Sequence, residues 1–306
     1  MKVLLATQKP FAAKAVEGIV SILTQAGHQV IKLEKYAEQS DLVKAVADVE
    51  AIIIRSDKVT EEVMAAAPKL KIVVRAGAGF DNVDLAAATA KGIVVMNTPG
   101  QNSNAVAELA LGLMIFMART QFTPATGSEL QGKRLGVQAY GNVGRLVGQK
   151  AKALGMDILA LDPFLTPEQI EAGGAKPVTD LGELYASSDF VSIHIPALPS
   201  TIRSIGYDLI TKMPKGATLV NTARKEVIDE DGLFRALEER PDLKYVADVM
   251  PDIYDELTKN FGHRVFATPK KMGAQTAEAN VNAGLAAARQ IVDFFATGNR
   301  KFQVNK

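Results

Sequence analysis

A glycine-rich segment, LGVQAYGNVGR, spans Leu135 to Arg145 and lies between two apolar stretches. The stretch that follows it, ILALDP, ends in the carboxylate of Asp162, 18 residues beyond Gly144. An apolar strand, a glycine turn that opens a helix, and a second strand with an acidic residue at its end form the order in which a Rossmann βαβ unit holds a dinucleotide. The pattern therefore predicts a site for a nucleotide cofactor.

Each residue of this turn has an expected part in binding. Gly141 lets the backbone approach a pyrophosphate, and the N–H groups that open the helix, at Asn142 and Val143, face its charge. Gly144 lets the helix pack closely on the strand. Ala139 takes the place of the first glycine of the fingerprint, which an alanine can fill if its φ stays negative. The alternative is a tight strand–helix turn that binds no cofactor.

The carboxylate of Asp162 favours NAD over NADP. It can accept hydrogen bonds from both ribose hydroxyls, and it would repel a 2′-phosphate. The PFLT segment that follows supplies no Arg or Lys to neutralise such a phosphate. We therefore predict NAD as the cofactor.

Composition narrows the class of protein. The chain has 306 residues, 47% hydrophobic and 23% charged, with a net charge of +1, which is typical of a globular protein of two domains. The charge gives no reason to expect binding to nucleic acid or to a membrane surface. Without cysteine there is neither a disulfide nor a thiolate metal site, and we expect no metal. The N-terminus lacks a signal peptide and no apolar run is long enough to span a bilayer, so we expect a cytoplasmic protein.

Short β-branched runs alternate with helical patterns along the chain, which predicts parallel, doubly wound sheets. Strands are expected near Val3, Val30, Ala51, Lys71 and Gly92, and again in the runs GVQAY, DILALD, FVSIHI, ATLVNTA, YVADV and VFATP. Helices are expected over 11–26, 41–48, 60–67 and 84–91. We predict an α/β fold with two such sheets, in which a Rossmann-type NAD domain is inserted into a flavodoxin-like substrate domain.

A last helix over 276–296 is long enough to return to the first domain. We therefore expect a discontinuous substrate-binding domain, 1–98 plus 283–306, and an NAD-binding domain over 99–282. The helix around 106–118 is unusually apolar. One of its faces is expected to pack within the chain and the other against a second copy, which predicts a homodimer. The alternative is a helix buried wholly within one chain.

Polar residues follow five of the predicted strands, where ligands bind in open parallel sheets. We expect these segments to converge on one cleft between the two domains. They are Arg55–Lys58, Arg75–Asn82, His194–Thr201, Asn221–Glu230 and Pro269–Thr276.

The chain resembles the D-isomer-specific 2-hydroxyacid dehydrogenases over nearly its whole length. The resemblance is carried, in family order, by RAGAGFDNVD, NTPGQNSNAVAEL, AYGNVGR, LDPF, HIPALPST, NTARKEVIDEDGL and GAQTAEA. Within that family it implies NAD-dependent oxidation of D-3-phosphoglycerate to 3-phosphohydroxypyruvate, the first step of serine synthesis. Two alternatives stay open, a reductase for glyoxylate or hydroxypyruvate and an NAD-sensing binding protein. Because the chain stops soon after its last helix, we expect no C-terminal regulatory domain.

Arg224, in NTAR, matches the catalytic arginine of the family. Its guanidinium suits the carboxylate and carbonyl of an α-keto acid and favours negative charge on the carbonyl oxygen during hydride transfer. The alternative is a surface arginine paired with Glu226 or Asp229.

The family places a histidine, paired with a glutamate, where this chain reads PKKMGA. Counting back from Gly273 puts Lys271 at that position, and counting forward from Pro269 puts Lys270 there. Near the expected glutamate stand Asp252 and Ile253. A lysine is cationic without a carboxylate partner, so the two departures agree, and we expect Lys271 to exchange the proton of the C2 oxygen once Lys270, Arg224 and partial desolvation lower its pKa. The alternative is a lysine that only binds an anion.

The remaining site residues divide between cofactor and substrate. Only three histidines exist, and none is expected to be the acid or base; the resemblance places His194 beside the cofactor. The resemblance implies further cofactor contacts from Ala78, Ile195, Pro196, Thr222, Ala223, Arg224, Asp248, Gly273 and Ala274, in addition to the glycine turn and Asp162. Cations and polar groups of the first domain are expected to hold a small phosphorylated hydroxy acid: Arg55, Ser56, Lys58, Arg75, Ala76, Gly77 and Asn102.

Overall fold

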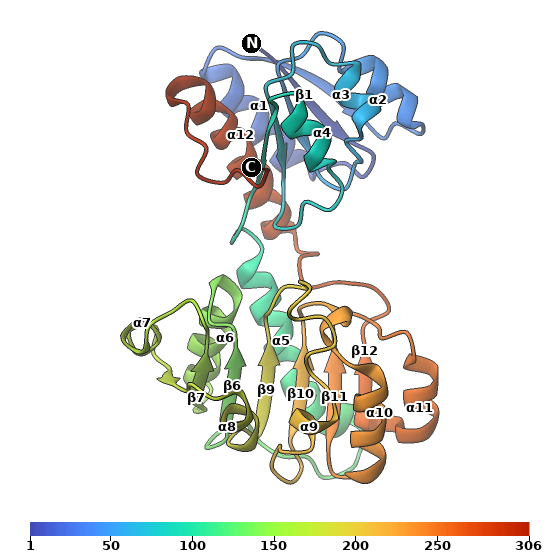
Figure 1. The fold of residues 1–306 in the computed structure, drawn as a ribbon, viewed down its shortest axis with the longest axis vertical. Coiled ribbons are helices and arrows are strands. Elements are labelled where there is room, and N and C mark those ends of the chain that lie inside the picture. The colour runs from blue at the N-terminus through green and yellow to red at the C-terminus, as the bar shows by residue number, and fades with distance from the viewer. Residues whose placement is uncertain (306) are drawn as a thin grey trace. The chain divides into compact units, whose positions relative to one another are not determined.

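The computed structural model describes residues 1–305, which form two compact units (Figure 1). The first unit consists of Met1–Asn102 together with the C-terminal stretch that begins at Gln275. The second unit, Ser103–Ala274, is inserted between these two parts of the sequence. Each unit is built on its own parallel sheet, so the predicted α/β fold with two doubly wound sheets is confirmed.

The first unit has a five-stranded sheet in the order β2-β1-β3-β4-β5, which is the flavodoxin-like order. Its strands are β1 (Lys2–Thr7), β2 (Gln29–Glu34), β3 (Ala51–Ile54), β4 (Ile72–Arg75) and β5 (Val94–Asn97). Its helices are α1 (Ala13–Gln25), α2 (Gln39–Ala45), α3 (Glu61–Ala65), α4 (Leu85–Ala90) and α12 (Ala277–Thr297).

Alternate residues of these strands build two cores, one on each face of the sheet. Val3, Leu5 and Ile53 pack with α1 and α12, whereas Leu4 and Ile52 pack with α2, α3 and α4. Because helices cover both faces of the sheet, the strands are continuous apolar runs in the sequence. These runs predicted the strands.

The second unit has a seven-stranded parallel sheet in the order β12-β11-β10-β9-β6-β7-β8, a Rossmann order with one added strand. Its strands are β6 (Arg134–Gln138), β7 (Asp157–Leu161), β8 (Lys176–Pro177), β9 (Phe190–Ile193), β10 (Thr218–Asn221), β11 (Lys244–Ala247) and β12 (Val265–Ala267). Its α-helices are α5 (Ser103–Ala118), α6 (Asn142–Ala153), α7 (Pro167–Ala172), α8 (Leu181–Ala186), α9 (Tyr207–Ile210), α10 (Glu230–Glu239) and α11 (Tyr254–Phe261). Single 3₁₀ turns lie at Thr120–Phe122, Lys225–Val227 and Gly262–Arg264.

The apolar helix α5 is largely buried within the second unit. It packs with α6 and with strands β10 and β11, and Leu113, Met114 and Met117 belong to the core on that face of the sheet. Ile115 remains 38% exposed. Most of the apolar surface that predicted a partner subunit is therefore covered by the chain itself.

The boundaries of the units follow the two helices at the junctions. Residues 99–102 and 275–282 group with the first unit, although the sequence placed them in the second. The reason is that α12 is continuous from Ala277 and packs along its length against α1, while α5 begins at Ser103 and packs on the second sheet. The binding roles expected for the two domains stay predictions.

The turn between β6 and α6 is strained at Ala139. Its φ is +71°, in the left-handed region, whereas the sequence argument required a negative value. The cause is the connection itself. The Ala139 N–H donates to the Leu161 carbonyl at 2.8 Å, and the chain must then reverse into a helix that opens at Asn142.

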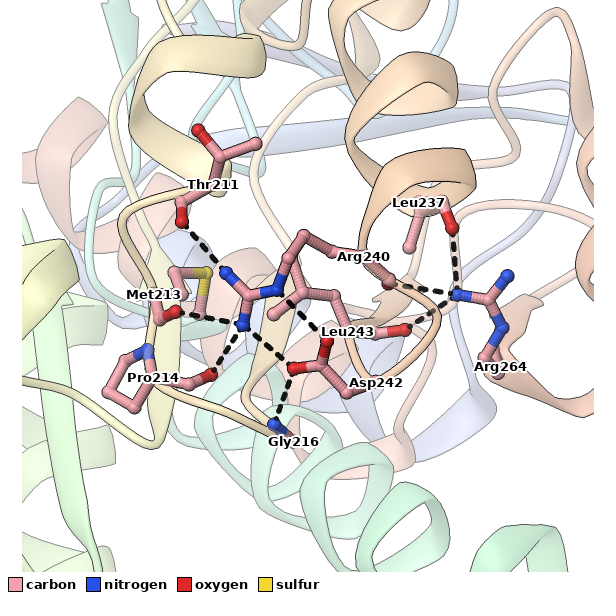
Figure 2. Close-up of polar contacts among 9 residues, drawn as sticks. All are labelled: Thr211, Met213, Pro214, Gly216, Leu237, Arg240, Asp242, Leu243 and Arg264. Carbon is pink, nitrogen blue, oxygen red and sulfur yellow. Dashed lines mark hydrogen bonds and ion pairs between the residues drawn. The ribbon is translucent and has the colours of Figure 1, made fainter.

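Two arginines fasten the loops at the opposite end of the second sheet (Figure 2). The Arg240 guanidinium donates to the carbonyls of Thr211, Met213 and Pro214, and it pairs with Asp242 at 2.8 Å. Arg264 donates to three further carbonyls, at Leu237, Arg240 and Leu243. The hydrogen bond and charge of Arg240 hold the pKa of Asp242 below its ordinary value. These contacts satisfy backbone carbonyls at and after the ends of α9 and α10.

In the part of the chain from residue 1 to residue 305, no helix combines the length and apolar character needed to cross a membrane.

We predict that Ala139→Gly stabilises the protein by about 0.5–1 kcal/mol. Left-handed backbone costs an alanine about 1–2 kcal/mol, and the extra entropy of an unfolded glycine cancels part of the gain. Chemical denaturation measures the difference. Ala153→Gly, at an exposed site in α6, is the control and should destabilise by about 1 kcal/mol. A loss of stability in Ala139→Gly would show that the alanine methyl contributes more than the strain costs.

We predict that Arg240→Met lowers the free energy of unfolding by about 2–4 kcal/mol, because three carbonyls and a carboxylate lose their donor. Urea titration provides the measurement. Arg203→Met serves as the matched control, since Arg203 pairs with Asp229 and Asp231 at an exposed position where ion pairs contribute little. Equal effects of the two substitutions would contradict the proposed role of the buried carbonyls.

Candidate active site

Because its strands are parallel, the second unit gathers the ends of β6, β9, β10, β11 and β12 at one edge of its sheet. The motifs that the sequence singled out follow these strands. They are the glycine turn after β6, His194 after β9, the NTAR segment from the end of β10, Asp248 after β11 and the PKKMG turn after β12.

The glycine turn leaves the start of α6 open. Gly141 is the N-cap residue, no side chain caps the helix, and a Cβ added at Gly141 would meet no atom within 4 Å. Nothing inside the protein therefore requires a glycine there. At Gly144 the reverse holds, because a Cβ would lie 2.2 Å from the Ala139 carbonyl oxygen. Gly144 thus permits the close helix–strand packing that the sequence predicted.

Asp162 lies half-buried at the end of β7 and is oriented by the backbone. Its Oδ2 accepts a hydrogen bond from the Tyr140 N–H at 2.8 Å, and its Oδ1 accepts one from the Phe164 N–H at 2.9 Å. A carboxylate has acceptor sites for further partners. The side chain is therefore fixed beside the glycine turn with capacity left for ribose hydroxyls.

His194 is not an acid or base in this arrangement. Burial lowers the pKa of His194 to about 3, so its imidazole is neutral at physiological pH. Its Nε2 lies 3.0 Å from Ser192 Oγ, and the backbone N–H of His194 donates to the Gln138 carbonyl. The ring is suited to packing against a ligand rather than to proton transfer, and the adjoining Ile195 and Pro196 continue the same strand-end loop.

The NTAR turn is shaped by a buried amide. Asn221 is fully buried, its Oδ1 accepts from the Ala223 N–H at 2.9 Å, and its Nδ2 donates to the Arg224 carbonyl at 2.8 Å. Between them, the Thr222 hydroxyl is buried without a hydrogen-bond partner. Such a group costs free energy unless a ligand satisfies it.

The two residues expected to be catalytic meet at one backbone atom. Arg224 Nη1 and Lys271 Nζ each donate to the Ala223 carbonyl oxygen at 2.9 Å. Both residues are exposed on this side of the unit. The fold therefore brings together two cations that are 47 positions apart in the sequence.

Asp248 organises the turn that carries Lys271. Its side chain has no exposed surface, and its two oxygens accept from the N–H groups of Met272 and Gly273, each at 2.7 Å. The Thr268 hydroxyl lies 3.0 Å from Oδ1. The contact with the cofactor that the sequence predicts for Asp248 stays a prediction; in the structure its carboxylate accepts hydrogen bonds from the protein's own backbone.

The neighbouring candidates make contacts of their own. Asp252, considered as a substitute for the family glutamate, forms an ion pair with Lys225 and is mostly exposed; this pairing raises the pKa of Lys225. Ile253 donates its N–H to Glu230. The Lys270 carbonyl accepts from the Thr268 hydroxyl at 2.8 Å. Lys271, rather than Lys270, has its ammonium beside Arg224.

These features fit a dinucleotide. The open start of α6, the vacant space over Gly141 and the oriented carboxylate of Asp162 would receive a pyrophosphate and a ribose. The unpartnered Thr222 hydroxyl follows β10, and the Gly273–Ala274 backbone lies in the turn after β12, at the same edge of the sheet. Within residues 1–305, no group of three metal-ligating side chains is present.

In the first unit, a second buried carboxylate organises the ends of β1 and β3. Asp57 is 2% exposed and accepts from the Gln8 N–H, the Tyr36 hydroxyl and the Arg55 N–H. Burial and the hydrogen bond to Asp57 raise the pKa of Tyr36. Asp57 thereby fixes the loop on which Arg55, Ser56 and Lys58 stand.

The predicted substrate residues occupy this same edge of the first sheet. Arg55 is half-buried, lies over the Phe11 ring and donates to the carbonyls of Lys9 and Pro10 and to Asn280; burial lowers its pKa. Arg75 Nε donates to the Arg55 carbonyl at 2.9 Å. The remaining members differ in exposure. Ser56 and Lys58 are exposed, Asn102 is half-exposed, and Ala76 and Gly77 are buried; Ala78, expected to contact the cofactor, is exposed on the same loop.

Sequence reasoning missed the side chains that orient these groups. Asp57, Asn221 and Thr268 each follow or end a buried strand, a position that could have drawn attention to them. Asp57 stands in the RSDK segment, in which only the cations and the serine were considered. For a short polar residue at a strand end, the sequence does not show whether the side chain faces a ligand or the backbone of its own loop.

Comparisons with known proteins identify the family of this chain. The family described as D-isomer specific 2-hydroxyacid dehydrogenase, catalytic domain, matches residues 11–305. D-3-phosphoglycerate dehydrogenase from Methanocaldococcus jannaschii is 38% identical, over 90% of this chain and 55% of its own length. The Homo sapiens protein of that name is 36% identical, over 89% and 53%. The chain thus spans about half the length of the curated relatives it matches.

Among solved structures, cofactor (NAD⁺)-bound 3-phosphoglycerate dehydrogenase from Entamoeba histolytica is 48% identical to this chain. The similarity covers 100% of this chain and 99% of that one, with a TM-score of 0.88. The motifs, the two sheets and these matches lead to one conclusion: the chain belongs to the D-isomer specific 2-hydroxyacid dehydrogenase family.

Proposed function

We propose that this protein is an NAD-dependent D-3-phosphoglycerate dehydrogenase, which oxidises D-3-phosphoglycerate to 3-phosphohydroxypyruvate. The observation that carries the proposal is the meeting of Arg224 and Lys271 on the Ala223 carbonyl, at the strand ends that also hold the glycine turn and Asp162. Relatives that bear this name match most of the chain, and the NAD⁺-bound structure of that name matches all of it. The same comparisons favour the dehydrogenase over a reductase for glyoxylate or hydroxypyruvate and over an NAD sensor.

The cofactor contacts in this proposal come from the second unit. The first turn of α6, from Asn142 to Gly144, would hold the pyrophosphate, and Asp162 the ribose. When bound, NAD⁺ accepts the hydride that leaves C2 of the hydroxy acid. The carboxylate of Asp162 disfavours the 2′-phosphate of NADP, and the segment after it carries no cation to offset that repulsion.

Arg224 and Lys271 divide the chemistry at the substrate. The guanidinium of Arg224 would hold the substrate carboxylate and stabilise negative charge on the C2 oxygen. In the neutral form, Lys271 Nζ would take the proton of the C2 hydroxyl as the C2–H bond breaks; in the reverse direction its ammonium returns that proton. The positive charge of Arg224 beside it favours the neutral amine.

The cations of the first unit would select the phosphate. Arg55 is held by three oxygen acceptors and fixed on a rigid loop, which suits recognition of a dianion at low entropic cost. We also propose that the protein forms a homodimer through the 106–118 helix, which the exposed side chains of Ile115 and Phe122 support. A cytoplasmic location is a further proposal.

We expect Lys271→Met to lower kcat for D-3-phosphoglycerate oxidation by about 10²–10⁴-fold, since that is the usual contribution of a general base. The Kd of NAD should change little. Lys270→Met removes the neighbouring charge of the same turn and is the control, with a small effect. Steady-state rates and cofactor titration test the pair. A wild-type rate in Lys271→Met, or a larger loss in Lys270→Met, would remove Lys271 from the mechanism.

We expect Arg55→Met to lower kcat/KM for D-3-phosphoglycerate by about 10–100-fold, because one charge-assisted contact to phosphate contributes about 1.5–3 kcal/mol. The value for unphosphorylated D-glycerate should stay within about twofold. Lys91→Met, which removes an exposed charge before β5, is the control and should alter neither value. Equal losses for both substrates would argue that Arg55 supports the fold instead of selecting the phosphate, and a wild-type preference for unphosphorylated acids would favour the reductase.

A further inference from the structure

Thr268 lies immediately after β12 and is 5% exposed. Its N–H donates to the Ala247 carbonyl at 3.0 Å, which continues the pairing of β12 with β11. Its hydroxyl oxygen lies 2.8 Å from the Lys270 carbonyl oxygen, 2.9 Å from the Asp248 carbonyl oxygen and 3.0 Å from Asp248 Oδ1. A single buried hydroxyl thus joins the strand end to the turn that carries Lys271.

All three neighbours of this hydroxyl are acceptors, and a hydroxyl has one proton to donate. The shortest contact is to the Lys270 carbonyl. That carbonyl belongs to the planar peptide unit that joins Lys270 to Lys271, so fixing its oxygen also fixes the N–Cα bond of Lys271.

The peptide unit on the other side of Lys271 is fixed independently. The Met272 N–H donates to Asp248 Oδ1 at 2.7 Å, and this N–H belongs to the peptide unit that joins Lys271 to Met272. Both planes that flank Lys271 are therefore anchored by buried groups, one by Thr268 and one by Asp248. Because only φ and ψ connect the two planes, the direction of the Lys271 side chain is set from both sides.

We propose that Thr268 is a positioning residue for Lys271, through its hydroxyl bond to the Lys270 carbonyl. The proposal rests on the role of Lys271 given under the proposed function. Loss of the hydroxyl frees the plane before Lys271 and loosens the plane after it, since the two planes meet at the Lys271 Cα, so the ammonium moves away from the Ala223 carbonyl and from Arg224. A displacement of this kind slows the proton step more than it weakens binding.

Thr268→Val keeps the shape of the side chain and removes the hydroxyl, and Thr268→Ser keeps the hydroxyl and removes the methyl. The two variants are compared for kcat, for the KM of NAD and of D-3-phosphoglycerate, and for hydrogen exchange at the amides of Met272 and Gly273. Thr218→Val, at a buried threonine at the start of β10, is the control and should leave kcat unchanged. If Thr268→Val does not fold, Thr268→Ala takes its place.

The expected result is a kcat about 10-fold lower in Thr268→Val, with both KM values within about twofold of wild type, faster exchange at the two amides, and recovery of at least half of kcat in Thr268→Ser. An unchanged kcat, a loss that falls mainly on KM, or a loss that serine does not recover overturns the proposal. If the wild-type protein does not oxidise D-3-phosphoglycerate, the proposed function has failed instead, and unchanged amide exchange in Thr268→Val would still overturn the anchoring of the turn.

Discussion

A fully buried carboxylate is the constraint on which the proposed active site depends. Removing the charge of Asp248 from water costs several kcal/mol unless donors surround it. The donors here are neutral: two successive backbone N–H groups in the turn after β12, those of Met272 and Gly273. If the turn opened, the buried charge of Asp248 would lose its hydrogen-bond donors, so Asp248 holds the turn closed. The closed turn places the Lys271 ammonium on the Ala223 carbonyl.

The first unit solves the same problem in the same way. Parallel strands end with backbone groups that no neighbouring strand pairs, and loops at this edge need side chains to satisfy them. Asp57 supplies a buried carboxylate to backbone N–H groups from two loops and to the Tyr36 hydroxyl. In each unit a buried carboxylate accepts hydrogen bonds from the backbone, and cationic side chains lie in the loop that this carboxylate fixes.

The sequence predicted the strands and the glycine turn well, because burial on both faces and close packing leave a local signal in residue type. It did not predict the two-residue strand β8, which is too short to show a pattern. It required a negative φ at Ala139, whereas the observed value is +71°. The residue type did not reveal this strain, because the strain arises from the register of β6 with β7. The backbone partners of polar side chains at strand ends were not predicted: Asp248 was considered only for the cofactor, a role that stays a prediction, and Thr268 and Asn221 were not assigned. Their partners are backbone atoms in loops whose paths depend on the whole sheet.

The replacement of the family histidine by Lys271 and the absence of its glutamate partner can be explained together. An imidazole needs a carboxylate to stay protonated near neutral pH and to keep one orientation. Lys271 is cationic without such help, and the Ala223 carbonyl, a neutral acceptor, orients it. Asp252, the nearest acidic residue to the expected glutamate, pairs with Lys225 instead. In the proposed mechanism Lys271 loses its proton during oxidation, and both the Ala223 carbonyl, which is a neutral acceptor, and the Arg224 guanidinium lie beside its ammonium.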